Sequence, residues 1–300
     1  MNFLVTPAPH RYSKNSTNDM YIMVSVCLLV CLLQAFLIYR LKALIVACAC
    51  LGACVLLDFI FYSIKHKKAG FDFSCLVTGL VLACIMPVNT PWVLCLVGGA
   101  VAIIFKYLFG GTGNNLFNSA ALARSILGCL FTQFSFSLYS GETALQLLLS
   151  GNKHLLSLDS LFLGKTVGAI GTSLILLVVV CAVILLIFKI IRWENLLFAI
   201  IGYSAMVWIF MGGDNVLPML LSGSFMFVTV FMLSDPTTSP SIFSARCIYA
   251  LCFGVVASLM MMNNIMGETA VFLALLVVNF LAPAFDKLFS GFYKGVKIND

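Results

Sequence analysis

Long apolar runs separated by short polar segments fill most of this 300-residue chain. A run of about 20 mainly apolar residues is long enough to cross the hydrocarbon core of a bilayer, so each such run predicts a transmembrane helix. The third and fifth runs are expected to be broken or partly re-entrant, because the third is short and the fifth contains polar residues. The pattern predicts ten helices, at residues 20–38, 43–63, 73–88, 91–109, 118–138, 166–190, 195–212, 216–234, 245–263 and 268–289.

Composition supports this interpretation, since 62% of the residues are hydrophobic and only 9% are charged. Soluble domains carry about 25% charged residues, so the sequence predicts an all-α integral membrane protein. The first apolar run begins near Met20, too late and too long for a cleaved signal peptide. The 12 Cys lie mostly within apolar runs and form no C-x-x-C pair. They are therefore interpreted as packing residues, and neither a metal site nor a nucleic-acid partner is expected.

The distribution of basic residues predicts the orientation. With a cytoplasmic N-terminus, twelve of the 17 Lys and Arg lie in inner segments and four in outer segments. Cytoplasmic segments of membrane proteins carry this excess. Both termini are therefore expected in the cytoplasm, and the polar segment after the fifth helix is expected on the outer face.

Two similar proline motifs suggest an internal repeat. Pro87–Pro91 follows the third predicted helix, and Pro236–Pro240 follows the eighth at the same internal spacing. Two units of five helices follow, and because five is odd the second unit would be inverted, as in many transporters. The expected divisions are a cytoplasmic segment 1–19, a first five-helix repeat 20–138, an outer loop 139–165, a second repeat 166–289 and a cytoplasmic tail 290–300.

Few polar groups lie within the apolar runs, and each has two interpretations. Arg124 either pairs structurally and reaches the interface, or binds a phosphate or an electron-rich ring. Gly110–Asn115 is either a tight turn or a loop that binds an anion through its backbone N–H groups.

The motif Asp235–Pro240 is either a turn or a ligand-lining segment, with hydroxyls from Thr237, Thr238 and Ser239 beside the carboxylate. The three His lie in loops, no catalytic constellation is evident, and no acidic residue lies convincingly within a span. Any reaction is therefore expected to depend on a cofactor.

Three motifs and the last predicted helix, which contains Asn279, carry a family resemblance; the motifs are Asn115–Arg124, the polar segment Ser140–Leu145, and Phe231–Pro240. With them the chain resembles, from about residue 70 to 289, the family that comprises the D subunit of the Rnf electron-transport complex and the B subunit of the sodium-pumping NADH:quinone reductase. One departure is Ser119, where the family commonly has Pro after the asparagine.

The resemblance implies that FMN is attached to Thr143 through a phosphoester, with Ser140 and Gly141 beside the bond. It also implies a second, non-covalent flavin (riboflavin) near the inner side, for which Asp235–Pro240 is the candidate neighbourhood. The full set of candidate flavin-binding residues is Thr143, Ser140, Gly141, Asn118, Arg124, Asp235, Thr237, Thr238 and Ser239.

Only about 19 residues precede the first predicted helix, which favours the D subunit over the B subunit with its longer N-terminal extension. The implied function is electron transfer between ferredoxin and NAD, coupled to Na⁺ or H⁺ movement across the bacterial inner membrane. The implied partners are the flavin-bearing G subunit and the cluster-bearing A, E, C and B subunits. The alternatives are a quinone-reductase B-like subunit, a secondary transporter or channel, and a purely structural anchor.

Overall fold

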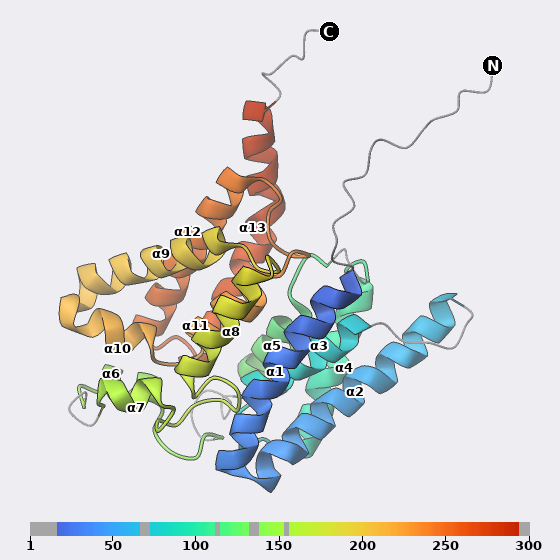
Figure 1. Ribbon diagram of the computed structural model, residues 1–300, viewed down its shortest axis with the longest axis horizontal. Helices are drawn as coiled ribbons and strands as arrows, with labels where there is room; N and C mark the ends of the chain where they lie inside the picture. Colours follow the sequence, from blue (N-terminus) through green and yellow to red (C-terminus); the bar gives the residue numbers. More distant parts are fainter. Residues whose placement is uncertain (1–16, 67–72, 112–114, 132–137, 153–155, 294–300) are drawn as a thin grey trace.

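The computed structural model describes residues 17–66, 73–111, 115–131, 138–152 and 156–293, and the regular elements among them are helices (Figure 1). The first half of the chain contains α1 (Thr17–Tyr39), α2 (Leu41–His66), α3 (Phe73–Ile85), α4 (Trp92–Leu108) and α5 (Ser119–Leu130). Two short helices follow, α6 (Ala144–Leu149) and α7 (Leu158–Phe162). The second half contains α8 (Ile175–Ile187), α9 (Trp193–Met211), η3 (Gly213–Asn215), α10 (Val216–Leu220), α11 (Phe225–Val228), η4 (Thr229–Leu233), α12 (Phe243–Met262), η5 (Gly267–Thr269) and α13 (Ala270–Tyr293).

Five helices in the described residues are long and apolar enough to cross a membrane; they lie in α1, α2, α9, α12 and α13. A sixth span is formed if Gly213–Leu220 and Phe225–Leu233, which are bent by 62° at their junction, are taken together. Shorter apolar helices are α3, α4, α5 and α8. The all-helical, multi-pass membrane protein expected from the sequence is thus confirmed.

The shorter helices differ from the predicted spans. The segment 166–190 was expected to be one helix, but its helical part begins only at Ile175. Before that point the backbone pairs with the end of α3, where Gly171 N donates to Cys84 O at 2.7 Å. A side chain at position 171 would collide with Cys84, so only glycine at this position lets the connector lie this close to α3. The eighth predicted helix is also interrupted, by the turn at Gly223, which has a φ of +63°.

Glycines bring two pairs of helices into close contact. Gly99 of α4 lies against Cys50 and Ala53 of α2, and Gly254 of α12 lies against the backbone of Ala199 in α9. Small residues let helix backbones approach closely, which is a main source of helix association where lipid surrounds both partners. Thus α2 packs along α4 in the first half, and α9 packs along α12 in the second half.

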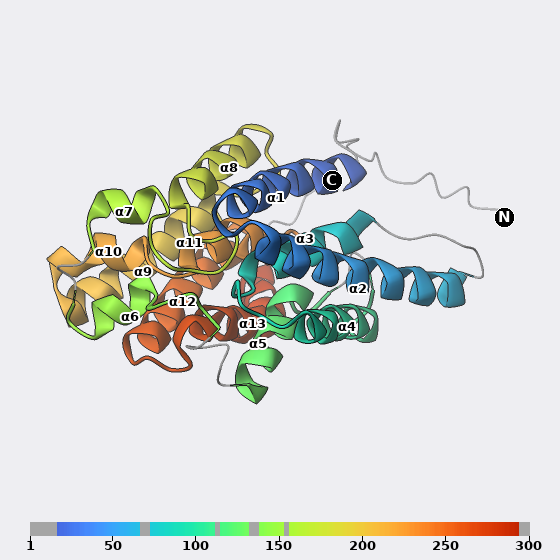
Figure 2. The same cartoon turned by 90° about the horizontal axis from the view of Figure 1, so that it is seen from below.

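Figures 1 and 2 show how the ends of these helices are distributed. In Figure 1, α13 ends toward the upper edge, while α6, α7 and the turn between α1 and α2 lie toward the lower edge. At that turn Lys42 Nζ donates to Asn89 Oδ1 at 2.9 Å, so the proline motif at 87–91 belongs to the same end as the turn.

The described cysteines are free thiols, and most are buried between helices. This agrees with their interpretation as packing residues. Residues 1–16 and 294–300, which make up most of the two expected cytoplasmic segments, lie outside the described residues, as do residues 112–114 of the glycine-rich loop.

Candidate functional site

Thr143 is the N-cap residue of α6 and is completely buried. Its Oγ1 accepts a hydrogen bond from Gln146 N at 3.3 Å, and Gln146 Oε1 accepts one from Thr143 N at 2.9 Å. This reciprocal pair is a capping box, which satisfies two backbone N–H groups at the start of the helix. The preceding residues Ser140, Gly141 and Glu142 are exposed, so the buried Thr143 directly follows a solvent-accessible segment.

The hydroxyl of Thr143 also donates a hydrogen bond to the carboxylate of Glu268. Glu268 lies in η5, is 2% exposed and accepts a second hydrogen bond from Ser224 N. Its Oε1 has no hydrogen-bond partner among the described residues. Three segments that are distant in sequence therefore meet at this carboxylate: the start of α6, the break between α10 and α11, and the start of α13.

Arg124 of α5 supplies the positive charge of this group of residues. It is fully buried and donates hydrogen bonds to Ile85 O and Thr269 Oγ1, both at 3.2 Å, and to the Tyr139 hydroxyl at 3.3 Å. Its guanidinium also lies 5.5 Å from the ring centroid of Phe272. Burial raises the pKa of the Tyr139 phenol above its ordinary value, although the adjacent Arg124 opposes this shift. We call Arg124, Tyr139, Thr143, Ser224, Glu268 and Thr269 the Glu268 cluster.

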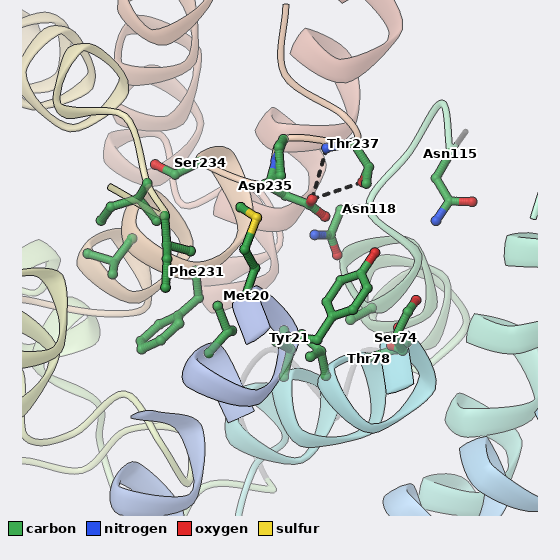
Figure 3. Close-up of a pocket in the computed structure, with 18 of the residues that line it drawn as sticks. Met20, Tyr21, Ser74, Thr78, Asn115, Asn118, Phe231, Ser234, Asp235 and Thr237 are labelled. Atoms are coloured by element: carbon green, nitrogen blue, oxygen red, sulfur yellow. Dashed lines mark hydrogen bonds between the residues drawn. The ribbon is translucent and has the colours of Figure 1, made fainter. Parts of the chain in front are cut away.

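A cavity of about 90 Å³ lies away from this cluster, between the start of α1, the start of α3 and the end of η4 (Figure 3). Its walls are mainly apolar, with Met20, Val81 and Phe231 among them. Figure 3 shows Asn118 and Asp235 close together on one wall, where the Asp235 carboxylate accepts hydrogen bonds from Thr237.

Pockets that bind small molecules commonly have apolar walls and a few polar groups that orient the ligand. The lining of this cavity has the same character. The candidate residues Asn118, Asp235 and Thr237 line it, together with Ser74, Thr78 and Ser234, whose contribution was not foreseen from the sequence. Of the other candidates, Thr238 is buried and its Oγ1 has no hydrogen-bond partner among the described residues, and Ser239 donates its backbone N–H to Asp235 O at 3.1 Å.

The candidate residues thus fall into two groups rather than one. Asn118 caps the start of α5 and lines the cavity, whereas Arg124 on the same helix belongs to the Glu268 cluster. Glu268 itself was missed by sequence reasoning, although an acidic residue at the start of an apolar run was a signal for it.

Two buried ion pairs also lie within the helices. Lys106 of α4 lies 3.7 Å from Asp58 of α2, and Arg246 of α12 lies 3.3 Å from Glu194 of α9. The expectation that no acidic residue lies within a span is therefore wrong for Asp58, which is fully buried inside α2. Its partner Lys106 was counted as a flanking basic residue, but it is 1% exposed.

Comparison with known proteins identifies the relationship. The family model described as NQR2, RnfD, RnfE matches residues 4–292, almost the whole chain. The chain belongs to the NQR2, RnfD, RnfE family.

Three relatives match this chain over different shares of its length. The D subunit of the Na⁺-translocating ferredoxin:NAD⁺ oxidoreductase complex of Acetobacterium woodii is 27% identical over 96% of the chain and 93% of its own length. The D subunit of the proton-translocating ferredoxin:NAD⁺ oxidoreductase complex of Clostridium ljungdahlii is 28% identical over 95% of the chain and 94% of its own length. The B subunit of the Na⁺-translocating NADH-quinone reductase of Chromohalobacter salexigens is 29% identical over 71% of the chain, and the match spans 57% of its length.

These relatives are subunits of ion-translocating oxidoreductase complexes. The chain is therefore a membrane subunit of the family found in such complexes. The resemblance drawn from the three sequence motifs is confirmed.

Proposed function

We propose that this chain is the D-type membrane subunit of an ion-translocating ferredoxin:NAD oxidoreductase, that it carries FMN on Thr143, and that it relays electrons coupled to Na⁺ or H⁺ movement. The observation that carries the assignment is coverage: the D-type relatives match more than nine-tenths of both chains, whereas the B-type relative matches 57% of its own length. The partners are then the other subunits of such a complex, including the flavin-bearing G subunit and the cluster-bearing A, E, C and B subunits.

The surroundings of Thr143 support its role as the attachment point. An ester would join Thr143 Oγ1 to the phosphorus of FMN. Because Thr143 is completely buried, its side chain would have to turn toward the exposed segment Ser140–Glu142 for the ester to form. At Gly141 an added Cβ would meet only Val167, at 3.5 Å, so space remains around this backbone. Arg124 supplies a buried positive charge in the same cluster, which suits a phosphate. The hydroxyl must exchange its hydrogen bond to Glu268 when the ester forms.

The cavity beside Asp235 is the proposed site of the second, non-covalent flavin. Its apolar walls suit an isoalloxazine ring, and the Asp235, Thr237 and Asn118 side chains offer hydrogen bonds to the polar edge of such a ring. Flavins supply one- and two-electron chemistry, and the protein contributes position and electrostatics.

The architecture that we propose is ten spans in two inverted repeats, at 20–138 and 166–289, with segments 1–19 and 290–300 in the cytoplasm and 139–165 outside. The packing of α2 along α4 and of α9 along α12 supports the repeat. The two proline motifs support the inversion, because 87–91 lies beside the turn between α1 and α2, whereas Pro236 lines the cavity beside the start of α1.

The test of the attachment is mass spectrometry of the peptide that contains Ser140–Thr143, with in-gel fluorescence of the denatured full-length chain from its own membranes. The wild-type peptide is expected to carry the mass of FMN, and Thr143→Ala is expected to lose both signals. Fluorescence that persists in Thr143→Ala would contradict the assignment.

Two control variants distinguish loss of the Thr143 hydroxyl from other effects of the Thr143→Ala substitution. Ser140→Ala removes an exposed hydroxyl three residues away and is expected to keep the flavin. Gln146→Ala removes the other half of the capping box but leaves Thr143 Oγ1 in place, so it controls for weakening of α6. The rival hypothesis of a solute transporter predicts no covalent flavin in any of these proteins.

A further inference from the structure

The carboxyl group of Glu268 is the least satisfied ionisable group in its cluster. It is 2% exposed and accepts hydrogen bonds from the Thr143 hydroxyl and Ser224 N, yet Oε1 has no partner in the described part of the chain. The carboxyl group packs closely against the turn before α11, because a Cβ added at Gly223 would lie only 2.8 Å from Glu268 Oε2. A buried carboxyl oxygen without a donor is costly for a carboxylate, but it is suited to carry a proton.

The groups that face Glu268 come from every element around it. Arg124 approaches from α5, Tyr139 from the segment before α6 and Tyr203 from α9. Among these described neighbours only Arg124 is positively charged, and its guanidinium also serves Ile85 O, Thr269 and Tyr139. One arginine therefore balances one carboxylate while Thr143 is unmodified.

A phosphoester at Thr143 changes this balance. A phosphodiester retains one negative charge, and the ester removes the hydroxyl hydrogen that Thr143 donates to Glu268. The carboxylate would then lose a donor and acquire an anionic neighbour in a site with little water. Two like charges at such close range do not both persist, and the carboxyl group is the one that can bind a proton.

We infer that Glu268 is a proton-binding site, which takes a proton from water onto Oε1 and holds it beside the phosphoester at Thr143. This inference rests on the proposed attachment of FMN. A metal cation is a poorer occupant, because it would add positive charge beside Arg124 and would need several oxygen ligands; the described residues hold no group of three or more His, Cys, Asp or Glu that could bind a metal. A protonatable group would thus lie beside an electron carrier within one subunit.

Infrared spectroscopy of the purified full-length chain tests the inference, because a protonated carboxyl group has a C=O stretching band that a carboxylate lacks. The flavin-bearing wild type is expected to show this band, with a shift in D₂O. Glu268→Gln is expected to lose the band and to keep its covalent flavin, since the amide imitates the neutral acid. Glu142→Gln, which removes an exposed carboxylate next to Thr143, is the matched control and is expected to leave the band unchanged.

A second comparison requires no substitution at position 268. The part of the band that Glu268→Gln removes is expected to be absent from wild-type chain prepared without attached flavin and from Thr143→Ala. A band of undiminished intensity in flavin-bearing Glu268→Gln, or one that is equal with and without flavin, would overturn the proton site. Covalent flavin in Thr143→Ala would instead overturn the attachment point, so the two failures are distinguishable.

Discussion

At the scale of single residues, Asp235 illustrates how the cavity sets the properties of a side chain. It is half-buried, and its Oδ1 accepts hydrogen bonds from Thr237 N at 3.0 Å and from Thr237 Oγ1 at 2.9 Å. Burial raises the pKa of this carboxyl above its ordinary value of 3.8, and the two hydrogen bonds from Thr237 oppose the shift without cancelling it. Folding therefore makes the ionised form of Asp235 less favourable than it is in the unfolded chain.

This direction of shift gives a pH-dependent prediction for Asp235→Asn. A carboxyl group whose pKa is raised by folding contributes stability below its unfolded pKa, and that contribution is lost as the pH rises through the folded pKa. Asparagine keeps an acceptor for Thr237 but has no such dependence. The thermal midpoint of the variant relative to wild type is therefore expected to increase as the pH is raised from about 4 towards neutrality, measured on the detergent-solubilised chain. A difference that falls over this range would contradict the direction of the shift.

Residues of the two candidate sites were predictable to different degrees. Thr143 and Asp235 stand in short motifs, which single out polar residues within an apolar chain. Glu268 became prominent only in three dimensions, because its contacts with Thr143 and Ser224 join segments far apart in sequence. The capping role of Thr143 was also not foreseen, although Gln146 three residues later is a capping-box signal.

At the scale of helices, close packing through glycine joins α9 to α12. Gly254 lies against Ala199 O and Tyr203 N, and Gly202 lies against Leu251 O. The pair is closed at one end by the ion pair between Arg246 and Glu194. The helices therefore run parallel, with their backbones in contact over more than one turn.

Gly254→Ala is expected to separate these helices. The new Cβ would overlap backbone atoms of α9, which cannot move independently. The free energy of unfolding is therefore expected to fall by about 1–3 kcal/mol. Gly52→Ala in α2 is the control, because a Cβ there has no atom within 4 Å, and it should be neutral or stabilising by up to about 1 kcal/mol through helix propensity. Thermal unfolding of both variants in detergent measures the difference. Equal midpoints would show that the glycine contact does not determine the packing.

Hydrophobic runs predicted where helices occur but not where they end. An apolar segment is equally compatible with a helix and with a buried connector, and the choice depends on partners that the sequence does not identify. Residues 166–174 are apolar enough to extend α8, yet their backbone instead hydrogen-bonds to the end of α3. The interruption at Gly223 is similar, because it brings Ser224 N to Glu268.

At the scale of the whole molecule, the two candidate sites lie in different regions of the fold. The cavity adjoins the start of α1, whereas Thr143 starts α6, which Figure 1 shows toward the same edge as the turn between α1 and α2. Transmembrane helices connect the two regions. In the proposed orientation the cavity faces the cytoplasm and Thr143 the outer side, so electrons that pass between the sites would cross much of the membrane within one chain.

Labelling of introduced cysteines tests this orientation. In sealed, right-side-out vesicles, a membrane-impermeant thiol reagent is expected to modify Ser140→Cys, because Ser140 is exposed beside Thr143 on the proposed outer face. Ser241→Cys, which is also exposed but follows the inner proline motif, should react only after the vesicles are opened. The wild-type chain controls for the exposed native thiols Cys48 and Cys129. The reverse pattern would place the Thr143 segment in the cytoplasm, and the excess of basic residues would then lie on the outer side, against the distribution that governs insertion.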